Sequence, residues 1–225
     1  MKKLILSALV TFLIGVIALG ILLFLPAGTF RYWQAWVFIV VFTVSTNIIG
    51  LYLSLKDPEL LERRKKIGPT TEQSPVQKII ISIAILSTLG LLVFCALDYR
   101  FGWSPVPTSV SIAGDVLVAL GLFINLLVFK ANSFGGSTVE IMENQKVIST
   151  GPYALVRHPM YVGVLIMVLG IPLALDSWWG LAILVLTIPV LALRILDEER
   201  LLEKDLPGYK EYEQKVHYRL VPYLW

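Results

Sequence analysis

Long uncharged runs dominate the sequence, and the first of them, Leu4–Leu25, contains no charged side chain over twenty-two residues. A helix of about 20 apolar residues crosses the hydrocarbon core of a bilayer, which is about 30 Å thick. The apolar core of a cleavable signal peptide is shorter, about 7–15 residues, so we interpret this run as a membrane helix that is kept. Only 16% of the residues are charged, against about 25% in soluble domains. Lipid must therefore cover much of the apolar surface.

Six such runs predict an all-α fold, a polytopic membrane helical bundle with about six transmembrane helices. The expected helices are Leu4–Leu25, Trp33–Leu55, Ile79–Leu97, Ile112–Phe129, Met160–Leu175 and Leu181–Leu196. The last two have only sixteen residues each and are separated by residues 176–180, which predicts a short C-terminal helical hairpin. The glycine fingerprint G-x-G-x-x-G does not occur, so no Rossmann domain is expected.

The runs divide the chain into two regions. Residues 1–129 form an N-terminal membrane region of four spans, and residues 130–225 carry a polar loop, the hairpin and a charged tail. Segment 56–78, between the second and third runs, is charged and contains three prolines, so we expect a surface connector there. The polar loop, residues 130–157, is longer than the roughly 12–15 residues beyond which loops are usually functional or disordered.

The basic residues predict how the chain is oriented in the membrane. With a cytoplasmic N-terminus, seventeen of the nineteen Lys and Arg residues fall on the cytoplasmic side, and only Arg31 and Arg100 fall outside. Cytoplasmic segments of membrane proteins carry an excess of Lys and Arg. We therefore expect six crossings, with both termini and the polar loop in the cytoplasm. Trp33, Trp103 and Trp178 then lie at the outer interface, where aromatic residues are enriched.

Composition narrows the classes of partner. A net charge of +3 is too small to predict nucleic-acid binding. One cysteine, Cys95, and two histidines do not support a Cys/His metal site, so no metal is expected. Neither the phosphate-binding motif G-x-x-x-x-G-K-[ST] nor the hydrolase motif G-x-S-x-G occurs.

A first polar cluster lies in residues 150–163, directly before the fifth run. It contains Tyr153, Arg157, His158 and Tyr161. Pro159 suits the first turn of the helix that follows, where its missing N–H costs nothing. The other backbone N–H groups of that turn, with His158 beside them, can bind an anionic group such as a carboxylate. The same residue types also anchor membrane helices among lipid headgroups, and the run alone is compatible with both interpretations.

A second polar cluster, residues 194–200, follows the sixth run. Arg194 and Glu198 are four residues apart and share one face of a helix. They can form a simple ion pair at the membrane surface. Alternatively, Arg194 can face an anionic substrate while Glu198 accepts hydrogen bonds from a cofactor. Because the two clusters flank the hairpin, both lie at its cytoplasmic end, and this convergence favours a functional site.

Residues 130–225 resemble the isoprenylcysteine carboxyl methyltransferase family, which is related to the membrane phospholipid methyltransferases. The shared pattern is T-G-x-Y, R-H-P-x-Y-x-G, a short apolar hairpin, R-x-x-x-E-E-x-x-L and G-Y-x-x-Y. Its most specific part is the R-H-P-x-Y block at residues 157–161 followed by the double glutamate at residues 198 and 199. The first four helices match only in being hydrophobic.

The resemblance implies a membrane methyltransferase that uses S-adenosylmethionine. It implies that the cofactor is bound by Val147, Ile148, Tyr153, His158, Pro159, Met160, Tyr161 and Glu198. Arg194 matches the family arginine that binds and orients the carboxylate of the acceptor, its catalytic role. This chain has Glu140 near a position where family members often have Gln.

The expected function is methylation of the carboxylate of an isoprenylcysteine-like or other lipophilic substrate, with the active site facing the cytoplasm. The expected partners are thus the lipid bilayer and a lipophilic or lipid-linked substrate. The alternative acceptors are a phospholipid amine and a small thiol. An ammonium acceptor should avoid a cationic neighbour, so Arg194 favours an anionic acceptor. A non-enzymatic transporter or scaffold is the alternative of another class, although transporters place polar residues at the bilayer midplane, which is nearly bare here.

Overall fold

The computed structural model describes residues 2–66, 68–72, 74–138 and 140–225, with side chains described from residue 12 onward except at residue 186. These residues contain helices and no β-strand. The helices are α1 (Lys2–Ala27), α2 (Trp33–Lys56), α3 (Pro58–Lys65), α4 (Pro75–Phe101), α5 (Thr108–Ala131), the 3-10 helix η1 (Gly151–Ala154), α6 (Pro159–Ala174), α7 (Trp179–Asp205) and α8 (Tyr209–Lys215). The predicted all-α fold is confirmed.

Apolar surface identifies the helices that lie in lipid. By length and composition, α2, α4, α5 and α7 can cross a membrane, and Phe12–Ala27 and α6 are shorter apolar helices. Large apolar side chains point outward from them, with Leu25, Leu55 and Leu86 exposed by 74%, 71% and 68%. A soluble protein rarely exposes contiguous apolar surface on this scale. The protein is therefore a helical membrane bundle.

The C-terminal hairpin differs from the prediction in the length of its second helix. α6 has the expected 16 residues, but α7 has 27 and continues nine residues past Leu196 to Asp205. Residues 197–205 are mostly Glu, Leu, Arg and Lys, which are good helix formers, and no Gly or Pro occurs until Pro207. The charged end of α7 therefore projects beyond the apolar run as continuous helix.

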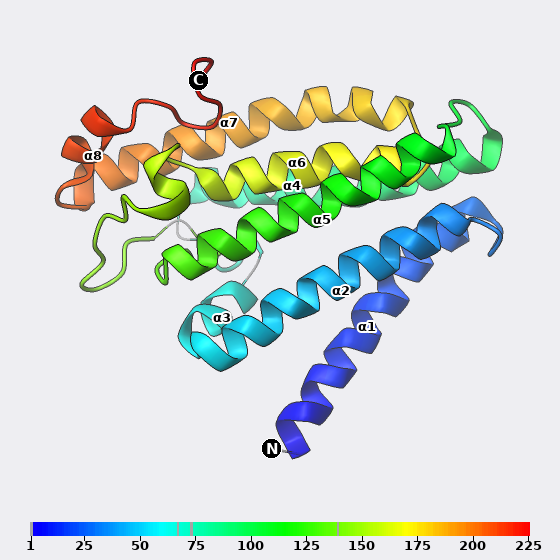
Figure 1. Cartoon of the computed structure of the whole chain (residues 1–225), viewed down its shortest axis with the longest axis horizontal. Coiled ribbons are helices and arrows are strands. Elements are labelled where there is room, and N and C mark those ends of the chain that lie inside the picture. The colour runs from blue at the N-terminus through cyan, green and yellow to red at the C-terminus, as the bar shows by residue number, and fades with distance from the viewer. Residues whose placement is uncertain (1, 67, 73, 139) are drawn as a thin grey trace.

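Glycines let α5 and α6 pack with their backbones in contact. A Cβ atom on Gly121 of α5 would lie 2.4 Å from the carbonyl oxygen of Gly163 in α6, and one on Gly114 would lie 2.3 Å from the backbone nitrogen of Ala174. Small residues at membrane helix interfaces permit this kind of close approach. α5 also packs against α2, so it lies between α6 and α2 (Figure 1).

Buried polar groups join the turns at one end of the bundle. The Asp98 carboxylate accepts hydrogen bonds from the backbone and the hydroxyl of Ser104 and, at 2.5 Å, from the hydroxyl of Ser177. The amide of Val106 donates to Asp176 at 2.6 Å. The α4–α5 and α6–α7 connections are thereby fixed to each other. α3, α8 and the long polar loop lie at the opposite end (Figure 1).

Segment 56–78, which we predicted as a surface connector, is more ordered than expected. Asp57 caps α3 by accepting a hydrogen bond from the amide of Leu60 at 3.0 Å, and Pro58 occupies the first turn. Pro75 begins α4 in the same way. Pro58 and Pro75 thus each start a helix, consistent with the preference of proline for the first helical position, whereas Pro69 lies in a turn. Among the described residues, the connector between α3 and α4 comprises only 66, 68–72 and 74.

Candidate functional site

A cavity lies at the end of the bundle that holds the long polar loop, between that loop, η1, the start of α6, the end of α7 and α8. All eight residues expected at the cofactor line it: Val147, Ile148, Tyr153, His158, Pro159, Met160, Tyr161 and Glu198. Glu140 lines it too, and its carboxylate accepts a hydrogen bond from the Thr138 hydroxyl at 2.9 Å. Arg194 is not among the described residues that form this lining.

Hydrogen bonds from two neighbouring elements hold Tyr153 in the wall. The side-chain amide of Asn132, just after α5, donates to its hydroxyl at 2.9 Å, and the hydroxyl of Tyr212 in α8 donates to its carbonyl at 2.7 Å. Burial raises the pKa of Tyr153 to about 12, so it is a neutral phenol at physiological pH. Asn132 was missed from sequence because it follows an apolar run and belongs to no motif.

His158 precedes α6 and is turned toward α7. Its Nε2 lies 3.1 Å from a carboxylate oxygen of Glu199, which leaves Nδ1 as the ring atom for a ligand. The amides of Tyr161 and Val162 both donate to the carbonyl oxygen of His158. The start of α6 therefore offers an anion fewer backbone donors than the sequence suggests.

Glu199 is buried at the centre of a cluster of charged side chains beside His158, which lines the cavity. Its oxygens lie 3.0 Å from Nε of Arg157, 2.7 Å from Nε of Arg219 and 3.1 Å from His158. The pairing continues from Arg157 to Glu213 of α8 at 2.6 Å. The backbone amides of Arg157 and His158 also donate to carbonyls of residues 218 and 219. The C-terminal segment thus holds the R-H-P turn in place, a role that the sequence analysis did not assign.

A hydrogen-bonded chain leads from the cavity to Arg194. The Tyr161 hydroxyl donates to Glu198 at 2.6 Å and accepts from Nε of Arg194 at 3.2 Å. Arg194 is buried, and among the described residues its ion pair is with Glu72, at 2.9 Å, rather than with Glu198. Arg194 and Glu198 therefore do not form the intrahelical ion pair that their spacing allowed, because the Tyr161 hydroxyl lies between their side chains.

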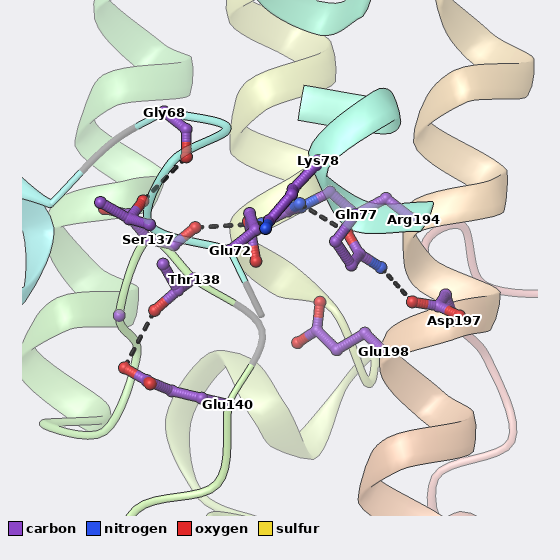
Figure 2. A network of polar contacts seen from close by, with 12 residues as sticks. Gly68, Glu72, Gln77, Lys78, Ser137, Thr138, Glu140, Arg194, Asp197 and Glu198 are labelled. Carbon is purple, nitrogen blue, oxygen red and sulfur yellow. Dashed lines mark hydrogen bonds and ion pairs between the residues drawn. The ribbon is translucent and has the colours of Figure 1, made fainter. Parts of the chain in front are cut away.

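Residues distant in sequence complete the surroundings of Arg194 (Figure 2). Nη1 donates to the side-chain oxygen of Gln77 in α4 at 2.6 Å, and Nη2 donates to the carbonyl of Ser137 at 3.0 Å. Gln77 in turn donates through its amide nitrogen to Asp197. Glu72 and Gln77 lie more than a hundred positions from Arg194, so no local pattern could identify them.

The short helix α3 braces the loop that forms one wall of the cavity. Nη1 of Arg64 donates to the carbonyls of Gly135 and Gly136 at 3.1 and 3.3 Å, and its guanidinium lies 4.2 Å from the ring centre of Phe129. Burial lowers the pKa of Arg64 to about 10, which still leaves it cationic at neutral pH.

The chemical character of the cavity fits S-adenosylmethionine. The side chains that line the cavity include an acid, two bases and two aromatic rings, which are Glu198, Lys146, Arg157, Tyr153 and Tyr212. Such a set can pair with an ammonium group, a carboxylate and a flat base, and aromatic faces attract a cationic centre such as a sulfonium. Among the described residues, no group of three His, Cys, Asp or Glu side chains is placed to hold a metal ion.

Residues 110–207 match the model of the phospholipid methyltransferase family. The matched stretch, less than half of the 225-residue chain, runs from α5 to just beyond the end of α7 and includes the residues that line the cavity except Tyr209 and Tyr212. That family of membrane methyltransferases includes the isoprenylcysteine carboxyl methyltransferases. The match supports a membrane-associated methyltransferase. No curated protein sequence matches the chain significantly.

Proposed function

We propose that the protein is an integral membrane methyltransferase that uses S-adenosylmethionine to methylate the carboxylate of an isoprenylcysteine-like or other lipophilic substrate. The observation that carries this proposal is the single cavity lined by all eight expected cofactor residues. Methyltransferases of the matched family generally use S-adenosylmethionine. The same cavity is joined to the expected acceptor-binding residue, Arg194, through Tyr161.

Each group of the site has a role in this proposal. Glu198 holds the cofactor's amino group. His158 holds its carboxylate by donating from Nδ1 while Nε2 donates to Glu199, and the start of α6 adds little because the amides of Tyr161 and Val162 already have partners. Bound there, S-adenosylmethionine supplies an electrophilic methyl group. The protein's contribution is to place an acceptor oxygen in line with that methyl, and such alignment can supply most of the rate enhancement. A carboxylate is already ionised at pH 7, so the site needs no general base.

In this proposal the acceptor enters from the bilayer through the lipid-facing surface of the helical bundle. The apolar tail enters sideways between helices while the polar head reaches the cavity at the end of α6 and α7. We place this end in the cytoplasm because it carries the Lys and Arg residues of the loops, the end of α7 and the tail.

A phospholipid amine is a second candidate acceptor, and a small thiol a third. Glu72 neutralises Arg194, which reduces the repulsion that an ammonium head would otherwise meet. The match to phospholipid methyltransferases points the same way.

The purified protein in detergent tests the proposal in two measurements. Calorimetric titration should show saturable binding of S-adenosylmethionine, and its absence would favour a transporter or scaffold. Transfer of a labelled methyl group to a panel of prenylcysteines, phosphatidylethanolamines and alkyl thiols should then show activity on the prenylcysteines. Activity on the amines alone would replace the carboxylate with the second candidate.

A further inference from the structure

Four of the five N–H donors of Arg194 are bonded in this structure to other groups of the described chain. Nε donates to Tyr161, Nη1 to Gln77, and Nη2 to both Glu72 and the carbonyl of Ser137. Arg194 is 8% exposed, and the side chain of Glu72 is 2% exposed. An acceptor carboxylate that binds the guanidinium through two parallel hydrogen bonds must therefore replace at least one of these groups.

The groups that hold Arg194 differ in the elements that carry them. Tyr161 belongs to α6 and Gln77 to α4, and Gln77 is further tied to Asp197 of α7. Glu72 belongs to the connector between α3 and α4, where a turn closes with the amide and hydroxyl of Thr71 donating to the carbonyl of Gly68 at 3.2 and 2.8 Å. Among the side chains that hold Arg194, Glu72 is thus the one carried by a connector and not by a membrane helix (Figure 2).

Glu72 is also the partner whose chemistry matches the expected acceptor. Exchange of one carboxylate for another at Nη2 preserves both the charge balance and the charge-assisted hydrogen bond of the buried arginine. An ammonium or a neutral thiol cannot make this exchange, because it would leave Arg194 without a counter-ion. The exchange thus discriminates between acceptor classes.

We propose that Glu72 is a specificity-determining residue that occupies the acceptor-carboxylate position at Arg194 and is displaced when a carboxylate-bearing acceptor binds. This inference rests on the proposed function and names the group that selects its acceptor. The Arg194–Tyr161–Glu198 chain stays intact during the exchange, so the acceptor position remains linked to the cofactor cavity.

Kinetics of Glu72→Gln test the exchange. Loss of the competing charge should lower KM for an S-prenylated N-acetylcysteine by several-fold or more, because the acceptor no longer displaces a charged partner. Glu59→Gln is the matched control, since Glu59 lies on α3 with its side chain 88% exposed, and its KM should equal that of the wild type. An increased KM for Glu72→Gln would show that Glu72 is only a structural counter-ion. Glu72→Asp, which keeps the charge, should retain a KM close to the wild-type value.

Limited trypsin digestion gives a readout that needs no methyl transfer. Lys65, the last residue of α3, and Lys66, the first residue of the connector, are both exposed. A prenylcysteine carboxylate, without S-adenosylmethionine, should speed cleavage at these sites several-fold in the wild type, whereas its methyl ester should not. Equal cleavage with acid and ester would overturn the role of Glu72 even if the protein proves to be a methyltransferase. Acid-specific cleavage in a protein that binds no S-adenosylmethionine would sustain the carboxylate exchange and refute the proposed reaction.

Discussion

Individual side chains at the cavity have more than one partner, so a substitution affects its neighbours as well as a ligand. Tyr161 contacts both Glu198 and Arg194, and His158 contacts Glu199 while it lines the cavity. The effects of such substitutions are therefore coupled rather than additive. Cofactor binding and acceptor turnover must be measured separately to assign each side chain its role.

Glu198→Ala and His158→Ala should each weaken binding of S-adenosylmethionine. Each loses a charge-assisted hydrogen bond worth about 1.5–3 kcal/mol, which corresponds to roughly tenfold or more in Kd. Calorimetric titration of the folded variants measures the change. Glu203→Ala serves as the control, because Glu203 is exposed on the same helix. Wild-type affinity in both variants would mean that these residues serve only the structure.

Arg194→Lys separates the acceptor role from a simple ion pair. Lysine keeps the charge opposite Glu72, but its three donors sit on one nitrogen and cannot reproduce the planar fork that reaches Tyr161, Gln77 and a carboxylate at once. Turnover of the acceptor should fall about tenfold or more, since each hydrogen bond to a charged group contributes about 1.5–3 kcal/mol. Affinity for S-adenosylmethionine should change little. Wild-type kinetics on the true acceptor would refute the role of Arg194.

At the scale of elements, the site depends on the contact between α5 and α6. α6 begins at the cavity and α5 leads into the loop that lines it. Their glycine contacts therefore determine how the first turn of α6 sits against that loop. α7 depends on α6 in a similar way, because a Cβ on Gly180 would lie 2.5 Å from Pro172 and 2.9 Å from the sulfur of Cys95.

Gly121→Ala should destabilise the bundle, whereas Gly90→Ala should not. The added methyl at residue 121 would lie 2.4 Å from the backbone of Gly163, while nothing lies within 4 Å of the corresponding position at residue 90. Overpacking costs about 1–3 kcal/mol, and Ala in place of an unconstrained helical Gly gains up to about 1 kcal/mol. Thermal unfolding in detergent should show a lower Tm for the first variant only. Equal Tm values would indicate that α5 and α6 separate easily.

At the scale of the whole molecule, charge and chemistry concentrate at one end. The cavity, the Glu199 cluster and the network around Arg194 all lie where α3, α8 and the long loop gather. The opposite end has short turns, and its Trp33, Trp103 and Trp178 are partly or largely exposed. Aromatic residues at one interface and Lys and Arg at the other are typical of an oriented membrane protein.

The orientation can be tested with introduced cysteines, because the native Cys95 is fully buried. In intact cells, a membrane-impermeant maleimide should label Phe30→Cys in the turn between α1 and α2, and should leave Lys65→Cys unlabelled until the membrane is permeabilised. A reporter fused after Trp225 should give a cytoplasmic signal. Labelling of Lys65→Cys in intact cells, or an external signal from the reporter, would reverse the predicted topology.

The sequence by itself determined the fold class and eight of the residues that line the cavity. Each apolar run forms a helix because its length and composition suit a bilayer, and backbone groups in lipid must bond within their own helix. The two polar clusters meet because they lie at the two ends of a tight helical hairpin. The hairpin is a local feature, so it can be recognised from the sequence. The eight expected cofactor residues consequently line one cavity.

Only the tertiary structure decided what Arg194 and Glu199 touch. From the spacing, Arg194 had one obvious partner, Glu198, yet Tyr161 lies between them and Glu72 supplies the counter-charge from 122 positions away. Arg219 reaches Glu199 in the same way, through a tail whose return path no local pattern predicts. The physical reason is that the length and composition of an apolar run place a helix in a membrane but carry no information about which distant connector lies against a buried charge. That choice depends on how α3, α4 and the C-terminal segment pack around the ends of α6 and α7.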